Sequence, residues 1–106
     1  MITKEDISKK FAAQLEKIKD QSLREKVVAT WHAAAEIGGW NSFEEIETMP
    51  FTMLTDTHGV NFIEHTIAVT EGAIGLAKSQ KATYKKMPYE IDMDRLVAGG
   101  LLHDVG

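Results

Sequence analysis

The stretch of sequence that decides the fold is residues 59–78, GVNFIEHTIAVTEGAIGLAK. Its apolar side chains recur every three or four residues, which is the spacing of a helix rather than of a strand. They form two stripes, one of Val60, Ile63, Ile67 and Ile74 and the other of Phe62, Val69 and Leu76. A helix with two apolar stripes is expected to be buried on two sides. The stretch therefore predicts a long helix that other elements cover on two sides.

Two glycines interrupt this helical pattern. Gly72 and Gly75 each lower helix stability by about 1 kcal/mol relative to alanine. Either another backbone passes close to the helix at these positions, or the helix simply tolerates them. The sequence leaves both explanations open.

The rest of the chain also has helical patterns. Apolar residues at helical spacing predict helices over residues 4–19, from Ser22 to the Gly38-Gly39 pair, from Ser42 to Pro50, and from Asp92 to Asp104. The first three begin at capping pairs, which are Thr3 with Asp6, Ser22 with Glu25, and Ser42 with Glu45. No run alternates apolar and polar residues for long enough to predict a strand. The predicted fold class is all-α, with about five helices.

Two connections are expected to lack regular structure. Residues 51–57 join the short third helix to the long one, and residues 78–90 are polar and contain Lys81, Lys85, Lys86 and Pro88. The three lysines form the only basic patch in the sequence. They could attract a phosphate, but a solvated loop is the commoner explanation of such a cluster. We therefore expect residues 78–90 to be a solvated loop.

Composition excludes several classes of function. The chain has 106 residues, a formal net charge of −4 and no cysteine. Nucleic acid is not an expected partner, because contacts with phosphates need a basic surface and the basic residues here cluster only in pairs. No stretch is long and apolar enough to span a bilayer, and the start, MITKEDISKK, is not a secretory signal, so a cytoplasmic location without a membrane partner is expected. Any metal must be held by histidine and carboxylate side chains.

The residues that point to chemistry are His65, His103 and Asp104. Both histidines lie in apolar helical patterns, where an unpaired imidazole would be costly to bury. A lone histidine is more often satisfied by a backbone carbonyl, but His103 is followed directly by Asp104 at the end of an apolar helix. The partial negative charge of a helix C-terminus disfavours a carboxylate there, and a bound cation would relieve both costs. We therefore expect these three residues to hold a metal ion.

The arrangement of these residues resembles that of a known family. Glu64-His65-Thr66 lies in the long helix, and Leu101-Leu102-His103-Asp104-Val105-Gly106 ends the last one. This is similar to the H…HD…D signature of the histidine-aspartate (HD) domain superfamily of metal-dependent phosphohydrolases. The resemblance implies an all-helical core in which His65, His103 and Asp104 bind a divalent metal, with His103 and Asp104 as catalytic residues. It also implies hydrolysis of a phosphate ester of a small, nucleotide-like substrate through metal-bound hydroxide.

The chain departs from the signature at its end. The last aspartate of the pattern has no counterpart, so residues 1–58 are expected to be an N-terminal helical extension and residues 59–106 the first part of a truncated metal-binding domain. Such a chain should hold its metal weakly or not at all, and alone it should be inactive. The uncovered apolar face of such a domain predicts self-association into a homo-oligomer.

Two imidazoles and a carboxylate suit Mn, Fe, Co, Ni or Zn better than Ca, which prefers oxygen ligands alone. His58, Asn61 and Glu64 lie near His65 in the sequence and could support a ligand through a hydrogen bond or contact the substrate. A purely structural role is the commoner explanation for each of them. His32 could also approach the site, although its spacing does not predict this. Four aromatic residues are expected to belong to the core rather than to a platform for a ligand, namely Phe11, Trp31, Trp40 and Phe62.

Two other functions remain open at this point. The chain could be a catalytically degenerate HD-like helical module for signalling or protein interaction, which the incomplete ligand set would favour. Less expected is a di-iron oxygenase or another hydrolase built on the same helices. If the chain is a module without catalysis, no metal is expected to bind. If it is a phosphohydrolase or one of these other enzymes, a metal is expected to bind.

Overall fold

The computed structural model describes residues 2–47 and 61–105, and this part of the chain is helical with no strand. Its helices are α1 (Lys4–Lys10), α2 (Ala12–Leu15), α3 (Gln21–Gly38), α4 (Phe43–Glu47), α5 (Phe62–Thr83) and α6 (Met93–Leu102). The all-α class is therefore confirmed. There are six helices in the described residues instead of about five, because the first predicted helix is divided in two.

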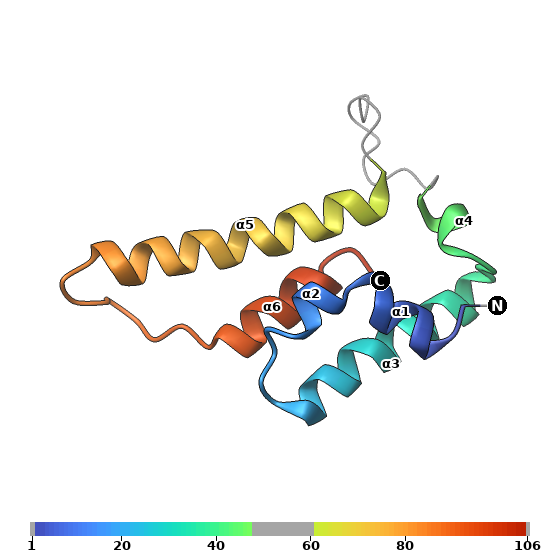
Figure 1. The fold of residues 1–106 in the computed structure, drawn as a ribbon, viewed down its shortest axis with the longest axis horizontal. Coiled ribbons are helices and arrows are strands. Elements are labelled where there is room, and N and C mark those ends of the chain that lie inside the picture. Colours follow the sequence, from blue (N-terminus) through green and yellow to red (C-terminus); the bar gives the residue numbers. More distant parts are fainter. Residues whose placement is uncertain (1, 48–60, 106) are drawn as a thin grey trace.

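The long helix α5 runs along one side of the molecule, and α6 returns beside it (Figure 1). Helix α6 also contacts α2 and α3, so it lies between the long helix and the N-terminal helices. The N-terminal helices gather near the start of α5, and the end of α5 extends beyond them (Figure 1). This arrangement places the beginning of α5 next to the end of α6.

One hydrophobic core joins all six helices. Its members include Ile7 of α1, Leu15 of α2, Trp31 of α3, Ile46 of α4, Ile63 of α5 and Leu101 of α6. Aromatic rings run through its centre, with ring centroids 5.0 Å apart between Phe11 and Trp31 and 6.3 Å apart between Trp31 and Phe62. These three residues are buried as predicted, and Trp40 packs against the core from its edge. The two segments expected from the sequence, 1–58 and 59–106, thus contribute to the same core.

The first predicted helix, over residues 4–19, is wrong in its extent. Thr3 and Asp6 form the predicted capping box of α1, but the helix ends at Phe11, whose φ of −108° and ψ of 23° are not helical. Helix α2 follows and ends at Leu15. Phe11 is fully buried and packs against Trp31, so its position is decided by tertiary contact. The apolar spacing continues through the break, which is why the sequence does not reveal it.

The other helix boundaries differ by a few residues from those predicted. Helix α3 is capped by Asp20 rather than Ser22, since Asp20 Oδ1 accepts a hydrogen bond from the Leu23 backbone N–H at 3.3 Å. It ends as predicted at the glycine pair, where Gly39 has a φ of 72° that suits glycine. Helix α4 begins after Ser42, whose Oγ accepts from the Glu45 N–H. Its predicted end at Pro50 and the connection over 51–57 lie outside the described residues.

Helix α5 is shifted relative to its prediction over residues 59–78. It begins after Asn61 and continues to Thr83, so the first part of the predicted loop over 78–90 is helical. Helix α6 begins after Asp92 as predicted. A Cβ added at Gly72 or Gly75 would meet nothing within 4 Å, which favours tolerance over a close backbone at these positions.

Two hydrogen-bonded carboxylates connect the N-terminal helices to α5 and α6. Gln14 Nε2 donates to Glu71 Oε1 at 2.8 Å, and Lys17 Nζ lies 3.0 Å from Glu71 Oε2. The hydrogen bond from Gln14 and that from Lys17 lower the pKa of Glu71. At the start of α6, the Asp94 carboxylate accepts the backbone N–H groups of Lys19 and Asp20, both at 2.9 Å. These contacts fix α2 on α5 and the α2–α3 turn on α6.

Asp94 gives the fold a pH dependence that can be measured. The hydrogen bonds from Lys19 and Asp20 hold the pKa of Asp94 below its ordinary value of 3.8. The resulting stability is complete well above pH 3.8 and is lost as the pH falls through the lower folded-state pKa. We expect Asp94→Asn to make the free energy of unfolding less dependent on pH between about pH 5 and about pH 3. Urea denaturation at several pH values measures this, with Glu90→Gln as an exposed control, and equal slopes for wild type and Asp94→Asn would contradict the expectation.

Some large apolar side chains are exposed. On α5, Val69 is 38% exposed and Leu76 is 62% exposed, and Ile37 near the end of α3 is 89% exposed. Self-association through such a surface stays a prediction. Among the described residues, the helices are too short or too polar to cross a membrane.

Candidate metal centre

The candidate metal centre forms where the start of α5 meets the end of α6. His65 is the fourth residue of α5. His103 is the C-cap residue of α6, and Asp104 follows it. His103 Nε2 lies 2.8 Å from Asp104 Oδ2, and His65 Nε2 lies 3.3 Å from the same oxygen. One ligand atom from each residue lies within 4.8 Å of those of the other two. The structure thus brings together all three residues that the sequence predicts as metal ligands.

The orientation of the His103 ring suits a ligand. Its Nδ1 lies 2.7 Å from the carbonyl oxygen of Gly100, and because a carbonyl only accepts, this nitrogen carries the proton and donates it. In the neutral ring, Nε2 therefore has its lone pair free and facing Asp104 Oδ2. Two acceptors 2.8 Å apart need a proton or a cation between them. A backbone carbonyl that orients a histidine in this way is common at metal sites.

The spacing and exposure of the three side chains also fit a metal ion. Ligand atoms that bind one first-row ion at about 2.1 Å lie roughly 3 to 3.5 Å from one another. The two distances to Asp104 Oδ2, 2.8 and 3.3 Å, are close to this range. The side chains of His65, His103 and Asp104 are 28%, 31% and 38% exposed, so an ion and a substrate could reach them from solvent. Nitrogen and oxygen ligands favour the transition ions expected from the sequence over Ca²⁺.

A buried hydrogen bond holds the end of α6 in place. Trp31 Nε1 of α3 donates to the carbonyl oxygen of Leu101 at 2.9 Å, two residues before His103. Both residues are buried, with 4% and 0% of their surface exposed, so this bond is shielded from water. The sequence predicts Trp31 only as a core residue, and nothing local in the sequence points to its partner.

A close contact between α5 and α6 sets the distance across the site. A Cβ added at Gly100 would lie 2.7 Å from Thr70 Oγ1 and 3.0 Å from Thr70 Cα. Thr70 itself is fully buried, and its hydroxyl donates to the carbonyl oxygen of Thr66. Gly100 therefore allows the two helices to approach closely just beyond the His65–His103 pair. The Gly99-Gly100 pair inside the last apolar helix is the sequence feature that could have indicated this contact.

The residues predicted to support the site have other partners in the structure. Asn61 and Glu64 form the capping box of α5, in which Asn61 Oδ1 accepts from the Glu64 N–H at 2.8 Å and Glu64 Oε1 accepts from the Asn61 N–H at 3.2 Å. This cap explains both side chains without a metal. His58 lies outside the described residues. His32 Nε2 lies 3.4 Å from Glu36 Oε1 on its own helix, and it is not part of the metal-ligand group.

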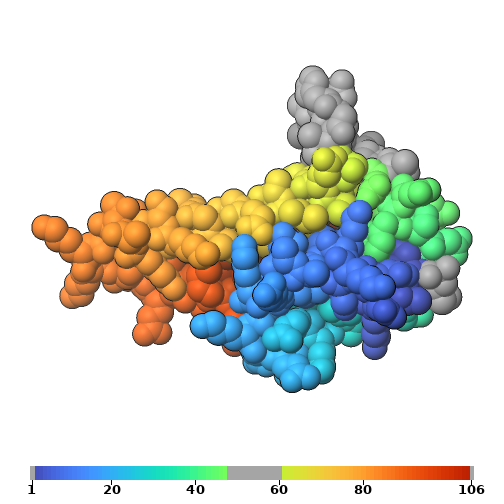
Figure 2. Space-filling view, viewed as in Figure 1, coloured from blue at the N-terminus to red at the C-terminus, as the bar shows by residue number. Residues whose placement is uncertain are grey.

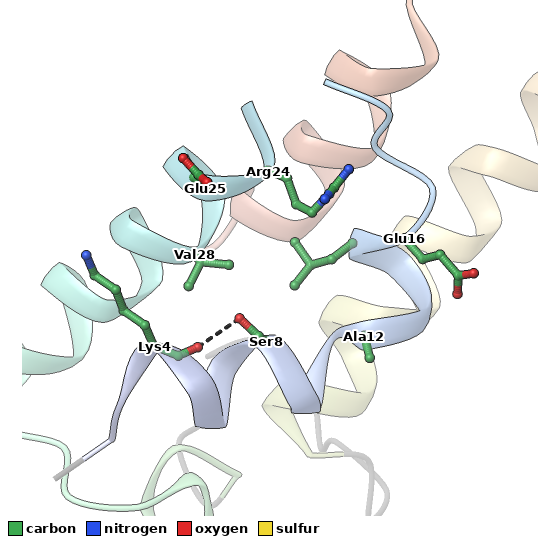
Figure 3. Close-up of a pocket in the computed structure, with 8 residues that line it drawn as sticks. Lys4, Ser8, Ala12, Glu16, Arg24, Glu25 and Val28 are labelled. Atoms are coloured by element: carbon green, nitrogen blue, oxygen red, sulfur yellow. Dashed lines mark hydrogen bonds between the residues drawn. The ribbon is translucent and has the colours of Figure 1, made fainter. Parts of the chain in front are cut away.

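Two of the hollows in the described part of the molecule differ in character. A small one of about 50 Å³ adjoins the candidate metal centre, since Asp104 and Val105 line it together with the aromatic side chains of Trp31, Trp40 and Phe62. A larger one of about 700 Å³ lies between α1, α2 and α3, and its rim carries Lys4, Glu16, Arg24 and Glu25 (Figure 3). None of the three candidate ligands lines the larger hollow.

Two imidazole nitrogens and a carboxylate oxygen, converging from two helices, define a candidate site for a divalent transition ion. No family model, no curated protein and no solved structure matches the chain. The roles of His65, His103 and Asp104 as ligands stay predictions that their geometry supports.

Proposed function

We propose that this protein is a metal-dependent phosphohydrolase that cleaves a phosphate ester of a small, nucleotide-like substrate. The observation that carries the proposal is the convergence of His65 with the adjacent residues His103 and Asp104, a pair that lies 38 positions later in the sequence. The resemblance of these residues to the HD signature supplies the reaction class and the nucleotide-like substrate.

The roles of the chain's own residues follow from their contacts. His65 and His103 would bind the ion through Nε2, and Asp104 would bind it through Oδ2 while neutralising part of its charge. The hydrogen bond from His103 Nδ1 to the Gly100 carbonyl would keep the ring in this orientation as the ion binds. A bound divalent ion would polarise a phosphoryl oxygen and lower the pKa of a coordinated water. The exposed side of the three residues is where a phosphate could enter.

The proposal is tested by measuring phosphate release from nucleoside monophosphates and from p-nitrophenyl phosphate with Mn²⁺, Co²⁺, Ni²⁺ or Zn²⁺. The test uses the longest product of the gene that contains these residues. We expect hydrolysis that requires the metal and that Asp104→Asn reduces by more than about 100-fold, since changes to residues that only support ligands already cost about 10- to 100-fold.

His32→Gln is the matched control for this assay, because His32 pairs with Glu36 outside the group and should leave the rate unchanged. Metal binding without any hydrolysis of phosphate esters would contradict the proposed reaction. Absence of both binding and hydrolysis would favour the degenerate module for signalling or protein interaction.

A further inference from the structure

The end of α5 and its connection to α6 differ in charge from the rest of the chain. Residues 78–90, here called the basic tip, contain four of the chain's 12 basic residues and one of its 16 acidic residues. The basic tip therefore has a formal charge of +3, and the remaining residues have −7, which together give the chain's net charge of −4. The four basic residues are Lys78, Lys81, Lys85 and Lys86.

The four lysine side chains are accessible to a binding partner. All four are exposed, and within residues 2–47 and 61–105 none of their ammonium groups is in an ion pair. The basic tip also contains two tyrosines. Tyr84 is 47% exposed and Tyr89 is 53% exposed. The Tyr89 hydroxyl donates to Gln80 Oε1 at 3.0 Å, which holds the connection against the end of α5. The basic tip thus presents unpaired positive charge together with amphipathic rings.

The basic tip projects from the molecule at the end opposite the N-terminal helices. Figure 1 shows α5 extending beyond the other helices before the chain turns back, and Figure 2 shows the same orange segment standing out at that end. Lys81 follows His65 by sixteen positions on one continuous helix, which corresponds to about 24 Å along its axis. A partner at the basic tip would therefore leave the metal centre open.

We propose that the basic tip docks on the surface of a membrane that contains anionic lipids. Lysines near such a surface are attracted by its negative potential, and tyrosine rings favour the headgroup region. A convex tip can touch a flat surface while the acidic remainder of the chain stays away from it. This peripheral contact needs no spanning helix. It departs from two expectations of the sequence analysis, which are a solvated loop and the absence of a membrane partner.

A nucleic acid fits the basic tip less well. Single strands are usually held along a basic groove. Two hollows adjoin the basic tip, and both have linings of mixed charge. Glu90 and Asp92 line one together with Arg95, and Asp92 and Asp94 line the other together with Lys17, Lys19 and Lys78. Neither hollow therefore has the uniformly basic lining that would hold a phosphate backbone, whereas a flat lipid surface would contact only the projecting residues.

The test is co-sedimentation of the protein with vesicles of phosphatidylcholine alone or with roughly 30% phosphatidylserine. We expect the bound fraction to be at least about fivefold higher on the anionic vesicles at about 50 mM salt and to fall as salt rises to about 300 mM. Lys81→Gln/Lys85→Gln/Lys86→Gln should reduce binding to the level seen with phosphatidylcholine. Lys4→Gln/Lys9→Gln/Lys26→Gln removes the same charge from exposed lysines on α1 and α3 and should keep most of the binding.

Three results would overturn the proposal. These are equal sedimentation with both kinds of vesicle at low salt, equal loss of binding in the two triple variants, and tighter binding to a single-stranded oligonucleotide than to anionic vesicles. Circular dichroism of both variants verifies that their helices are intact. His65→Gln should not alter vesicle binding, so this proposal and the proposed function can fail independently.

Discussion

We expect His65→Gln to lower the affinity of the protein for a divalent transition ion by more than about tenfold. The substitution removes one of three candidate ligands, and the amide of the introduced glutamine is a poorer ligand for such ions than an imidazole nitrogen. His103 and Asp104 remain, with their ligand atoms 2.8 Å apart, so weak residual binding is expected. Isothermal titration calorimetry with Mn²⁺, Ni²⁺ and Zn²⁺ measures the change directly.

His32→Gln is the control for this titration as well. It replaces the same type of side chain at a partly buried helical position, where the imidazole pairs with Glu36. We expect its affinity to equal that of the wild type. Equal losses in the two variants would indicate binding to scattered histidines and would contradict the proposed centre. The affinity should also fall in acid, because protons compete with the ion for the same ligand atoms.

Gly100→Ala is expected to destabilise the protein and weaken the metal centre together. The added Cβ would lie 3.0 Å or less from atoms of Thr70, which is buried and cannot move without displacing its own hydrogen bond. Overpacking of this kind costs about 1 to 3 kcal/mol, and the gain in helix propensity offsets about 1 kcal/mol of it. As α5 and α6 separate, the distance between His65 and His103 grows and metal affinity falls.

Gly99→Ala provides a control at the adjacent residue. A Cβ added there would meet nothing within 4 Å, so only the helix propensity changes. We expect this variant to be more stable than the wild type by up to about 1 kcal/mol. Chemical denaturation of both variants tests the contrast, and a Gly100→Ala protein as stable as Gly99→Ala would show that the two helices are not in close contact.

Local signals in the sequence predict much of this fold. The capping residues Thr3 and Asp92 and the left-handed Gly39 mark helix ends by chemistry that acts within a few residues. The predicted cap of α3, Ser22, is wrong, because Asp20 lies two residues earlier, is also of a type that caps helices, and takes this role. The break at Phe11 left no local signal, because it depends on packing against Trp31, which is distant in the sequence.

The three residues of the candidate site were predicted from their types and from the His103-Asp104 pair, and the structure places them together. Their supports were predicted less well. The hydrogen bond from Trp31 to Leu101 and the contact of Gly100 with Thr70 join residues that are far apart in the chain. Such pairs cannot be derived from spacing along one helix. Asn61 and Glu64, considered as supports of the site, form a cap whose pattern was present in the sequence.

The hydrogen bond between Trp31 and Leu101 makes the half of the chain that carries the candidate ligands depend on the other half. That half is therefore not expected to fold correctly when it is transferred alone to another protein. A segment of residues 59–106 would include all three candidate ligands but would lose the indole that satisfies the Leu101 carbonyl. It would also uncover Val97 and Leu101, which are fully buried in the intact chain. The N-terminal helices are therefore structural partners of the centre, and evolutionary shuffling or protein engineering would have to transfer both halves together.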